Sequence, residues 1–135
     1  MTIPTTIPSV LAREAADEAA AAGAAATGSA AAPDPATRPL IVDVRERNEF
    51  EQERVDGVVL LPISEFVARH EELPKDRPLL MLCAAGSRST SATMYLLQNG
   101  WSDVRNITGG MIGWRHANLP IVTGTPGPDE GDLPG

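Results

Sequence analysis

The chain has a single cysteine, Cys83, which stands between an apolar run and a loop of small residues. Leu79–Leu82 is short and wholly apolar, which is typical of a strand buried on both faces. After the loop the pattern predicts a helix that ends at Asn99–Gly100, with Ser89 or Thr90 as its N-cap. A cysteine between a buried strand and a helix faces backbone N–H groups and the positive end of the helix dipole, which both favour a thiolate.

The residues after Cys83 predict an anion-binding loop with the sulfur at its centre. Small side chains let the loop curl until several N–H groups converge, and Gly86 can adopt a positive φ without strain. The alternative is that Cys83 is an inert hydrophobic residue at the end of a core strand. The Gly, Ser and Arg residues that follow it favour a reactive thiol. The predicted loop comprises Ala84, Ala85, Gly86, Ser87, Arg88 and Ser89.

Two roles are open for the polar residues of this loop. Arg88 either clamps an anionic substrate or braces the loop by holding its carbonyls and a carboxylate such as Asp43 or Glu49, and we favour the brace. Ser87 and Ser89 either donate their hydroxyls to the substrate or cap the helix.

A second buried strand ends in charged residues. The strand predicted over 40–45 carries Asp43 and Arg45 near its carboxyl end. In an open parallel sheet the ligand crevice lies beyond the carboxyl ends of the strands, so both residues are expected on the same edge as Cys83. We predict that Asp43, Arg45 and Glu49 support the loop rather than transfer protons.

The remaining patterns alternate between strand and helix. This alternation predicts an α/β fold with a central parallel sheet of about five strands and helices on both faces. Ser9, Asn48 and Ser64 are the expected N-caps of three of the helices. The expected strands are 3–7, 40–45, 58–61, 79–82 and 103–107, and the expected helices are 10–20, 48–52, 64–70, 89–98 and 111–117.

Length and composition limit the classes of function. At 135 residues the chain fits one domain, expected over residues 1–123, with a mobile Ala- and Pro-rich segment at 24–38 and a disordered acidic tail at 124–135. A net charge of −7 argues against binding to nucleic acid or to anionic membranes. One cysteine excludes an intrachain disulfide and offers no zinc-ligand spacing, so we predict neither a metal nor a cofactor. No run is apolar enough for a membrane helix and no secretory signal is evident, which predicts a cytoplasmic protein.

These motifs together resemble the rhodanese-like single-domain sulfurtransferases. The resemblance runs from about residue 40 to residue 122. It rests on Asp43-Val44-Arg45, Glu49-Phe50, Gly57, Leu60, Pro62, the stretch from Cys83 to Ser89, Asn106, Gly109-Gly110, Trp114 and Leu119-Pro120-Ile121.

The resemblance implies that Cys83 carries a persulfide that the 84–89 loop holds by its N–H groups. The implied donor is thiosulfate or a persulfide, and the implied acceptor is a thiol or cyanide, with a sulfur-carrier protein as a further candidate partner. Four residues separate Cys83 from Arg88, whereas the related phosphatases have five, which favours sulfur transfer over phosphatase action. A cysteine-dependent reductase on this scaffold would need an outside thiol.

Two departures from the family pattern stand out. Ala84 and Ala85 take positions where a basic or bulky residue is frequent, which weakens the case for capture of a dianion such as thiosulfate. Arg54 stands where many relatives have His. The alternative to an enzyme is a non-catalytic or sensing module that binds a partner protein.

Overall fold

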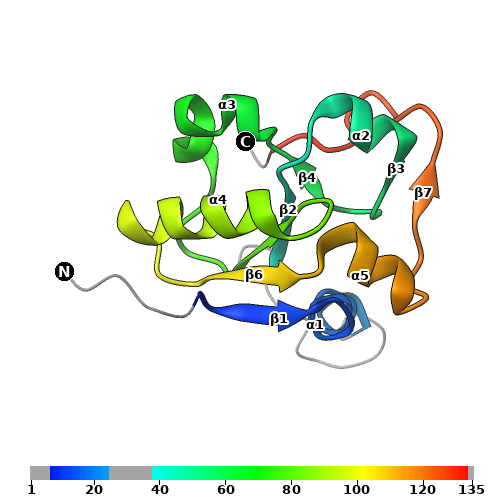
Figure 1. The fold of residues 1–135 in the computed structure, drawn as a ribbon, viewed down its shortest axis with the longest axis horizontal. Helices are drawn as coiled ribbons and strands as arrows, with labels where there is room; N and C mark the ends of the chain where they lie inside the picture. Colours follow the sequence, from blue (N-terminus) through cyan, green and yellow to red (C-terminus); the bar gives the residue numbers. More distant parts are fainter. Residues whose placement is uncertain (1–6, 25–37, 134–135) are drawn as a thin grey trace.

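The computed structural model describes residues 7–24 and 38–133. These residues form an α/β fold with a five-stranded parallel sheet in the order β1-β6-β5-β2-β4, which confirms the predicted fold class (Figure 1). A two-stranded antiparallel sheet, β3-β7, lies beside it. The elements are β1 (Ser9–Leu11), α1 (Ala12–Ala24), β2 (Leu40–Asp43), α2 (Arg47–Gln52), β3 (Glu53–Arg54), β4 (Val59–Leu60), α3 (Ile63–Arg69), the 3₁₀ helix η1 (His70–Glu72), β5 (Leu79–Leu82), α4 (Ser87–Gln98), β6 (Val104–Thr108), α5 (Gly110–His116) and β7 (Val122–Thr123).

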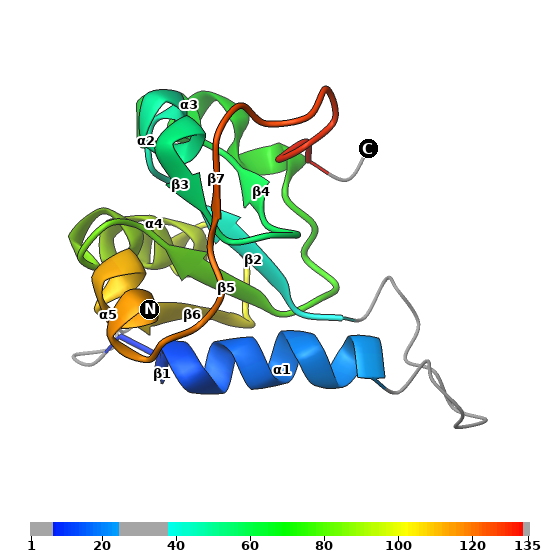
Figure 2. The ribbon, with the colours of Figure 1, turned by 90° about the vertical axis from the view of Figure 1, so that its right-hand side faces the viewer.

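The sheet separates two hydrophobic cores, because alternate residues of its strands point to opposite faces. In β5, Leu79 and Met81 face the core that α3 and α4 cover, while Leu80 and Leu82 face the core that α1 and α5 cover (Figures 1 and 2). All four residues of β5 are buried. This burial on both faces explains why the strand sequence is continuously apolar rather than alternating.

The parallel register brings the charged end of β2 beside the end of β5. Asp43 pairs with Leu82, so the residues that follow both strands emerge side by side at the carboxyl-terminal ends of the strands. The amide of Val44 donates to the carbonyl of Leu82 at 2.8 Å, which extends this pairing past the end of β2. Asp43 and Cys83 therefore lie at the same edge, as the sequence predicts.

The N-terminal prediction is wrong in its details. Residues 9–11 are strand β1, which pairs with β6, and Ser9 is therefore not a helix N-cap. Val10 is buried in the core, and this long-range pairing outweighs the local helical pattern. The helix begins at Ala12, two residues after the predicted start, and ends at Ala24, four residues beyond the predicted range of 10–20. Most of the expected 3–7 strand and of the 24–38 segment lies outside the described residues.

Two other helices begin earlier than predicted, because they use other caps. α2 begins at Arg47, and the amide of Glu46 donates to Glu49 Oε1 at 3.1 Å, so Asn48 is not the cap. α3 begins at Ile63 after Pro62, which places Ser64 inside the helix. Proline and the reciprocal glutamate contact replace the side-chain caps that the sequence pattern favours.

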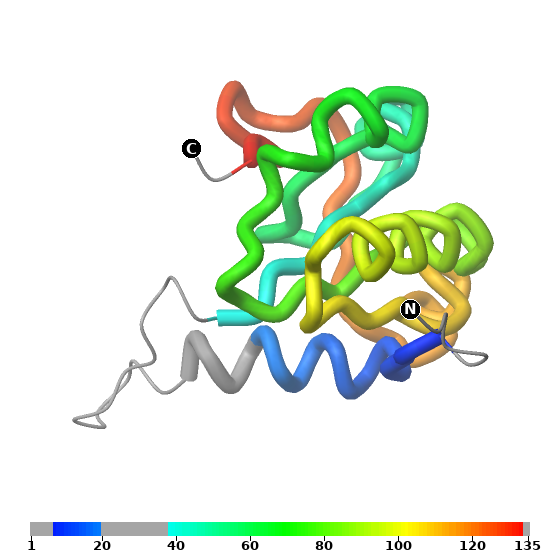
Figure 3. Tube along the Cα trace, turned by 90° about the vertical axis from the view of Figure 1, so that its left-hand side faces the viewer, coloured from blue at the N-terminus to red at the C-terminus, as the bar shows by residue number. Residues whose placement is uncertain are grey.

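The expected disorder of the C-terminal tail disagrees with the structure, which places residues 124–133 against the domain. The segment passes β3 and reaches the sheet edge at β4, as Figures 2 and 3 show from two sides. The carbonyl of Gly131 accepts a hydrogen bond of 2.7 Å from the amide of Leu60, and the side chain of Leu133 packs against the core. The pairing covers the exposed edge of β4, which composition alone does not indicate.

None of the helices in the described part of the chain has the length and apolar character needed to span a bilayer.

Candidate active site

The Cys83 sulfur lies directly after β5 and is fully buried. The amide of Gly86 donates a hydrogen bond to Cys83 Sγ at 3.0 Å, so the loop curls back onto the sulfur. Gly86 has a φ of +108°, a conformation that glycine adopts without strain. The loop is therefore built to present backbone N–H to a sulfur anion.

The helix after the loop begins earlier than predicted. α4 starts at Ser87 with Gly86 as its N-cap, so neither Ser89 nor Thr90 is the first cap. Ser89 instead lies buried in the first turn, with its hydroxyl 3.2 Å from Cys83 Sγ. Ser87 is exposed at the start of the helix. Of the two serines, Ser89 is the one that the fold brings to the sulfur.

A buried asparagine fixes the Ser89 hydroxyl. Ser89 Oγ lies 2.5 Å from Asn106 Oδ1 on β6 and 3.1 Å from the carbonyl oxygen of Gly86. In the contact between Cys83 and Ser89 either atom can be the donor. While its single proton is donated to Asn106 Oδ1 or to the Gly86 carbonyl oxygen, the Ser89 oxygen can accept from a Cys83 thiol. To donate to a sulfur anion the same proton must turn from these oxygens to Sγ, which lies 3.2 Å away.

The N-terminus of α5 holds the other side of the loop. The amide of Met111 donates to the carbonyl of Cys83 at 2.8 Å, and the amide of Ile112 donates to the carbonyl of Ala84 at 3.1 Å. A Cβ at Gly110, whose φ is +54°, would lie 2.2 Å from the Cys83 oxygen. Gly110, the first residue of α5, is therefore required by the close approach of this helix to the loop, which adds to the role of the glycine pair as a turn.

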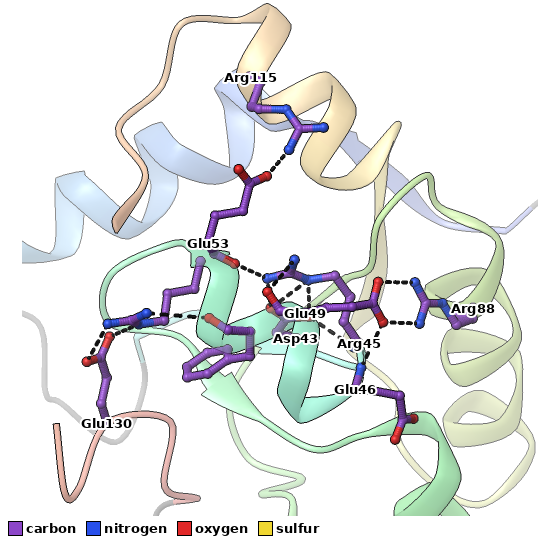
Figure 4. Close-up of polar contacts among 10 residues, drawn as sticks. Asp43, Arg45, Glu46, Glu49, Glu53, Arg88, Arg115 and Glu130 are labelled. Carbon is purple, nitrogen blue, oxygen red and sulfur yellow. Dashed lines mark hydrogen bonds and ion pairs between the residues drawn. The ribbon is translucent and has the colours of Figure 1, made fainter. Parts of the chain in front are cut away.

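The predicted supporting residues form two ion pairs behind the loop. Arg88 makes a bidentate pair with Glu49, with Nη1–Oε1 and Nη2–Oε2 distances of 2.6 and 2.9 Å (Figure 4). This is the brace contact that we favour for Arg88. The hydrogen bond from Arg88 lowers the pKa of Glu49 to about 2, and the pair raises the pKa of Arg88.

The second pair is buried. Arg45 is 3% exposed and binds Asp43 through Nη2 at 2.8 Å and through Nε at 3.0 Å. Arg45 Nη2 also donates to the carbonyl of Glu53 at 2.7 Å. The guanidinium thus links the end of β2 to the start of β3.

Comparison with known proteins identifies the family to which this fold belongs. Residues 27–117 match the family model described as the rhodanese-like domain. The chain belongs to this family.

Named relatives of this rhodanese-like domain agree with the assignment. A protein of Allochromatium vinosum named sulfurtransferase is 40% identical over 83 residues, which are 62% of this chain and 78% of the relative. The thiosulfate sulfurtransferase GlpE of Shewanella oneidensis is 35% identical over 78 residues, which are 58% of this chain and 77% of that protein. A rhodanese-related protein of Thermoplasma volcanium, 24% identical, superposes with a TM-score of 0.69 over 85% of this chain and 97% of its own, which supports the fold.

The sequence reasoning missed the side chains that line the approach to the loop of this rhodanese-like domain. A cavity of about 290 Å³ opens beside Ala84, the residue after the cysteine. Met111 and Arg115 of α5 contribute to its wall, as do Gln52 and Glu53 of the α2–β3 segment. One sequence signal points to this wall. It is Arg115, a charged residue directly after Trp114 on the helix that follows the glycine pair.

Arg54, the departure from the family pattern, lies away from this cavity. Its side chain is 2% exposed and binds Glu130 of the tail through Nε and, at 3.0 Å, through Nη2. Arg54 Nη1 also donates to the carbonyl of Gly124 at 2.6 Å. The residue therefore anchors the C-terminal segment to the domain.

Proposed function

We propose that this protein is a sulfurtransferase that carries a sulfane sulfur on Cys83 as a persulfide. Membership of the rhodanese-like family and the named sulfurtransferase relatives support an enzyme of this class. The donor is thiosulfate or a persulfide, and the acceptor is a thiol, cyanide in assays, or a sulfur-carrier protein. A cytoplasmic location is part of the same proposal.

One contact carries the proposal, the hydrogen bond from the Gly86 amide to Cys83 Sγ. A buried thiol without a polar role needs no N–H group aimed at it, whereas a thiolate or a persulfide anion needs donors to replace water. Ser89 adds a hydroxyl at 3.2 Å. The Gly86 N–H is fixed on the sulfur before the reaction, which is the condition under which a donor stabilises developing charge most effectively, and the Ser89 hydroxyl can turn its proton from Asn106 Oδ1 to the sulfur.

The two half-reactions need only the sulfur chemistry of Cys83. The thiolate attacks the outer sulfur of thiosulfate, the S–S bond of the donor breaks, and sulfite leaves with the electron pair. The product is a Cys83 persulfide anion. A thiolate or cyanide then attacks its outer sulfur and releases the Cys83 thiolate, which completes a ping-pong cycle. The step consumes no oxidant and needs no general base.

The loop contacts predict which residues assist this cycle. Arg88 stays in its pair with Glu49 and holds the loop, while the Ala84 and Ala85 side chains leave the approach to the sulfur open. The N–H groups of the loop and the Ser89 hydroxyl bind the persulfide. Asn106 acts through Ser89 as a positioning residue.

Intact mass tests the proposal. Purified protein is incubated with thiosulfate and, separately, with a persulfide donor. We expect a gain of about 32 Da, one sulfur atom, that cyanide reverses and that the Cys83→Ser variant lacks. Circular dichroism of the variant confirms that it is folded. A wild-type protein that takes up no sulfur from either donor refutes the proposal and favours a protein-binding module.

A further inference from the structure

A cavity lies beside the loop and is lined in part by Ala84, the residue after Cys83. Its place next to the cysteine makes it the candidate site for the head group of a donor whose outer sulfur reaches Cys83. The charged side chains of the cavity wall are Arg45, Glu49, Glu53 and Arg115. At about 290 Å³ the space fits a small molecule rather than a folded partner.

Three arginines around the loop and the cavity are each paired with a carboxylate. Asp43 pairs with Arg45, Glu49 pairs with Arg88, and Glu53 pairs with Arg115 (Figure 4). These six groups sum to no net charge, and a Cys83 thiolate makes the sum negative. A doubly negative donor therefore gains no net attraction from the cavity wall and meets the carboxylates of Glu49 and Glu53.

The three pairs differ in how firmly their arginines are held. Arg45 is buried, and Arg88 makes two hydrogen bonds to the same carboxylate. Arg115 contacts Glu53 with a side chain that is 46% exposed, while the Glu53 side chain is 25% exposed. Figure 4 shows the Arg115 side chain extending from α5 to this carboxylate. Of the three pairs, this is the one that a ligand can replace at low cost in free energy, because a partly exposed ion pair contributes little stability.

We propose that Glu53 and Arg115 form the head-group site for a zwitterionic small-molecule persulfide, one that carries a carboxylate and an ammonium group as an amino acid does. Arg115 takes the carboxylate and Glu53 takes the ammonium, so the ligand replaces one ion pair by two. This inference rests on the proposed function and names its donor class. It also explains why the wall beside the loop carries carboxylates, which oppose thiosulfate.

The sulfur transfer from this donor balances without a further reagent. The Cys83 thiolate attacks the outer, protonated sulfur of the donor, and the donor S–S bond breaks as the new S–S bond forms. The donor leaves as its thiolate with the electron pair. The proton stays on the transferred sulfur, which gives a protonated Cys83 persulfide. Neither Glu53 nor Arg115 touches the reacting sulfur atoms, so both are specificity residues.

The test compares donors that differ only in their head groups. Cysteine persulfide carries both an ammonium and a carboxylate group. Cysteamine persulfide carries the ammonium alone, and 3-mercaptopropionate persulfide carries the carboxylate alone. Thiosulfate is the doubly negative donor. Loading of Cys83 is followed by intact mass in quenched time courses, for wild type, Glu53→Gln and Arg115→Gln. Glu65→Gln, which removes one carboxylate of an exposed pair on α3, is the matched control.

We expect Glu53→Gln to raise the half-saturating concentration of the cysteine and cysteamine persulfides and to lower that of thiosulfate, each by about twofold to fivefold, the range of a partly exposed ion pair. Arg115→Gln should raise the half-saturating concentrations of the cysteine and 3-mercaptopropionate persulfides and should change that of the cysteamine persulfide less. The changes should lie in the half-saturating concentrations rather than in the rates at saturation. Glu65→Gln should behave as wild type.

Two results separate this inference from the proposed function. If wild type is loaded by these donors but neither variant changes the order of preference among the head groups, the head-group site is refuted and sulfur transfer stands. If none of the donors loads the wild-type protein, sulfur transfer itself fails, and the inference fails with it.

Discussion

The brace between Arg88 and Glu49 predicts a pH-dependent part of the stability of the domain. The pair lowers the pKa of Glu49 from an ordinary value of 4.5 to about 2, chiefly through the hydrogen bond from Arg88. Replacing Glu49 by Gln removes the charge, keeps the shape of the side chain and leaves Arg88 without its anion. The perturbation therefore tests the brace directly.

The magnitude follows from the pKa of Glu49. The difference between 4.5 and about 2 corresponds to about 3 kcal/mol, at 1.36 kcal/mol for each pH unit. The side chains of Arg88 and Glu49 are 32% and 30% exposed, so solvent screens part of this energy. We therefore expect Glu49→Gln to lower the free energy of unfolding by about 1–2 kcal/mol at pH 7.

The sign of the pH dependence is fixed by the direction of the pKa change. Because the folded protein holds the Glu49 proton more weakly than the unfolded chain, the stabilisation is complete above about pH 5. It is lost as the pH falls through 4.5 towards about 2. Urea unfolding of wild type and Glu49→Gln, followed by tryptophan fluorescence between pH 7 and pH 2.5, should show the difference between the two proteins shrinking across this range.

Two controls make this prediction refutable. In a double-mutant cycle, Arg88→Gln and Glu49→Gln should lose less together than the sum of their separate losses. Glu65→Gln removes an exposed carboxylate away from the loop and should change the unfolding midpoint little. Fully additive losses, or a difference between wild type and Glu49→Gln that stays constant from pH 7 to pH 2.5, would show that the two side chains do not brace the loop.

Three further changes test other parts of the site. Gly110→Ala should destabilise the domain by about 2 kcal/mol or more and slow sulfur loading, because its Cβ would lie 2.2 Å from the Cys83 oxygen; thermal unfolding and intact mass measure both effects. Ser89→Ala should slow loading by about fivefold, since it removes one neutral hydrogen bond of about 1 kcal/mol to the sulfur, measured in single-turnover time courses. Glu130→Gln should lower the urea midpoint, because it removes the carboxylate bound to Arg54, and should increase proteolysis of the tail.

Matched substitutions control these three predictions. Gly57→Ala also places alanine at a positive φ, of +83°, but in open space, so equal losses in Gly57→Ala and Gly110→Ala would contradict the steric argument. Ser87→Ala removes an exposed hydroxyl of the same loop and should leave loading unchanged. Asp129→Asn removes an exposed charge next to Glu130, and a midpoint shift as large as that of Glu130→Gln would argue against the contact with Arg54.

Local sequence signals identify the reacting part of the molecule. The four apolar residues of β5, followed by a cysteine, small residues and an arginine, fix a buried strand, a tight loop and a helix within 20 residues of one another. The positive φ of Gly86 is equally local, whereas β2 ends at Asp43, two residues before the predicted end at residue 45. The pattern places the N-cap of α4 at Ser89 or Thr90, three or four residues after the observed cap Gly86, because the polar Ser89 is used inside the fold.

Other features depend on contacts that no local pattern encodes. β1 forms where β6 offers an unpaired edge, although residues 10–20 are as a set good helix formers. The tail, rich in Pro, Gly and acidic residues, packs on β4 because Arg54 binds Glu130, which lies 76 positions later in the chain. Composition predicts disorder there, since it contains no information about a buried arginine elsewhere in the chain.

The same distinction separates the reaction from its substrate. The persulfide loop is one continuous segment, so its residue types and spacing indicate the class of chemistry. The head-group cavity is assembled from α2, β3 and α5, and the pairing of Glu53 with Arg115 exists only after the glycine pair has brought α5 against the loop. Donor preference in this domain is therefore a property of distant segments. Substitutions at Glu53 and Arg115 should redirect it while the Cys83 loop stays intact.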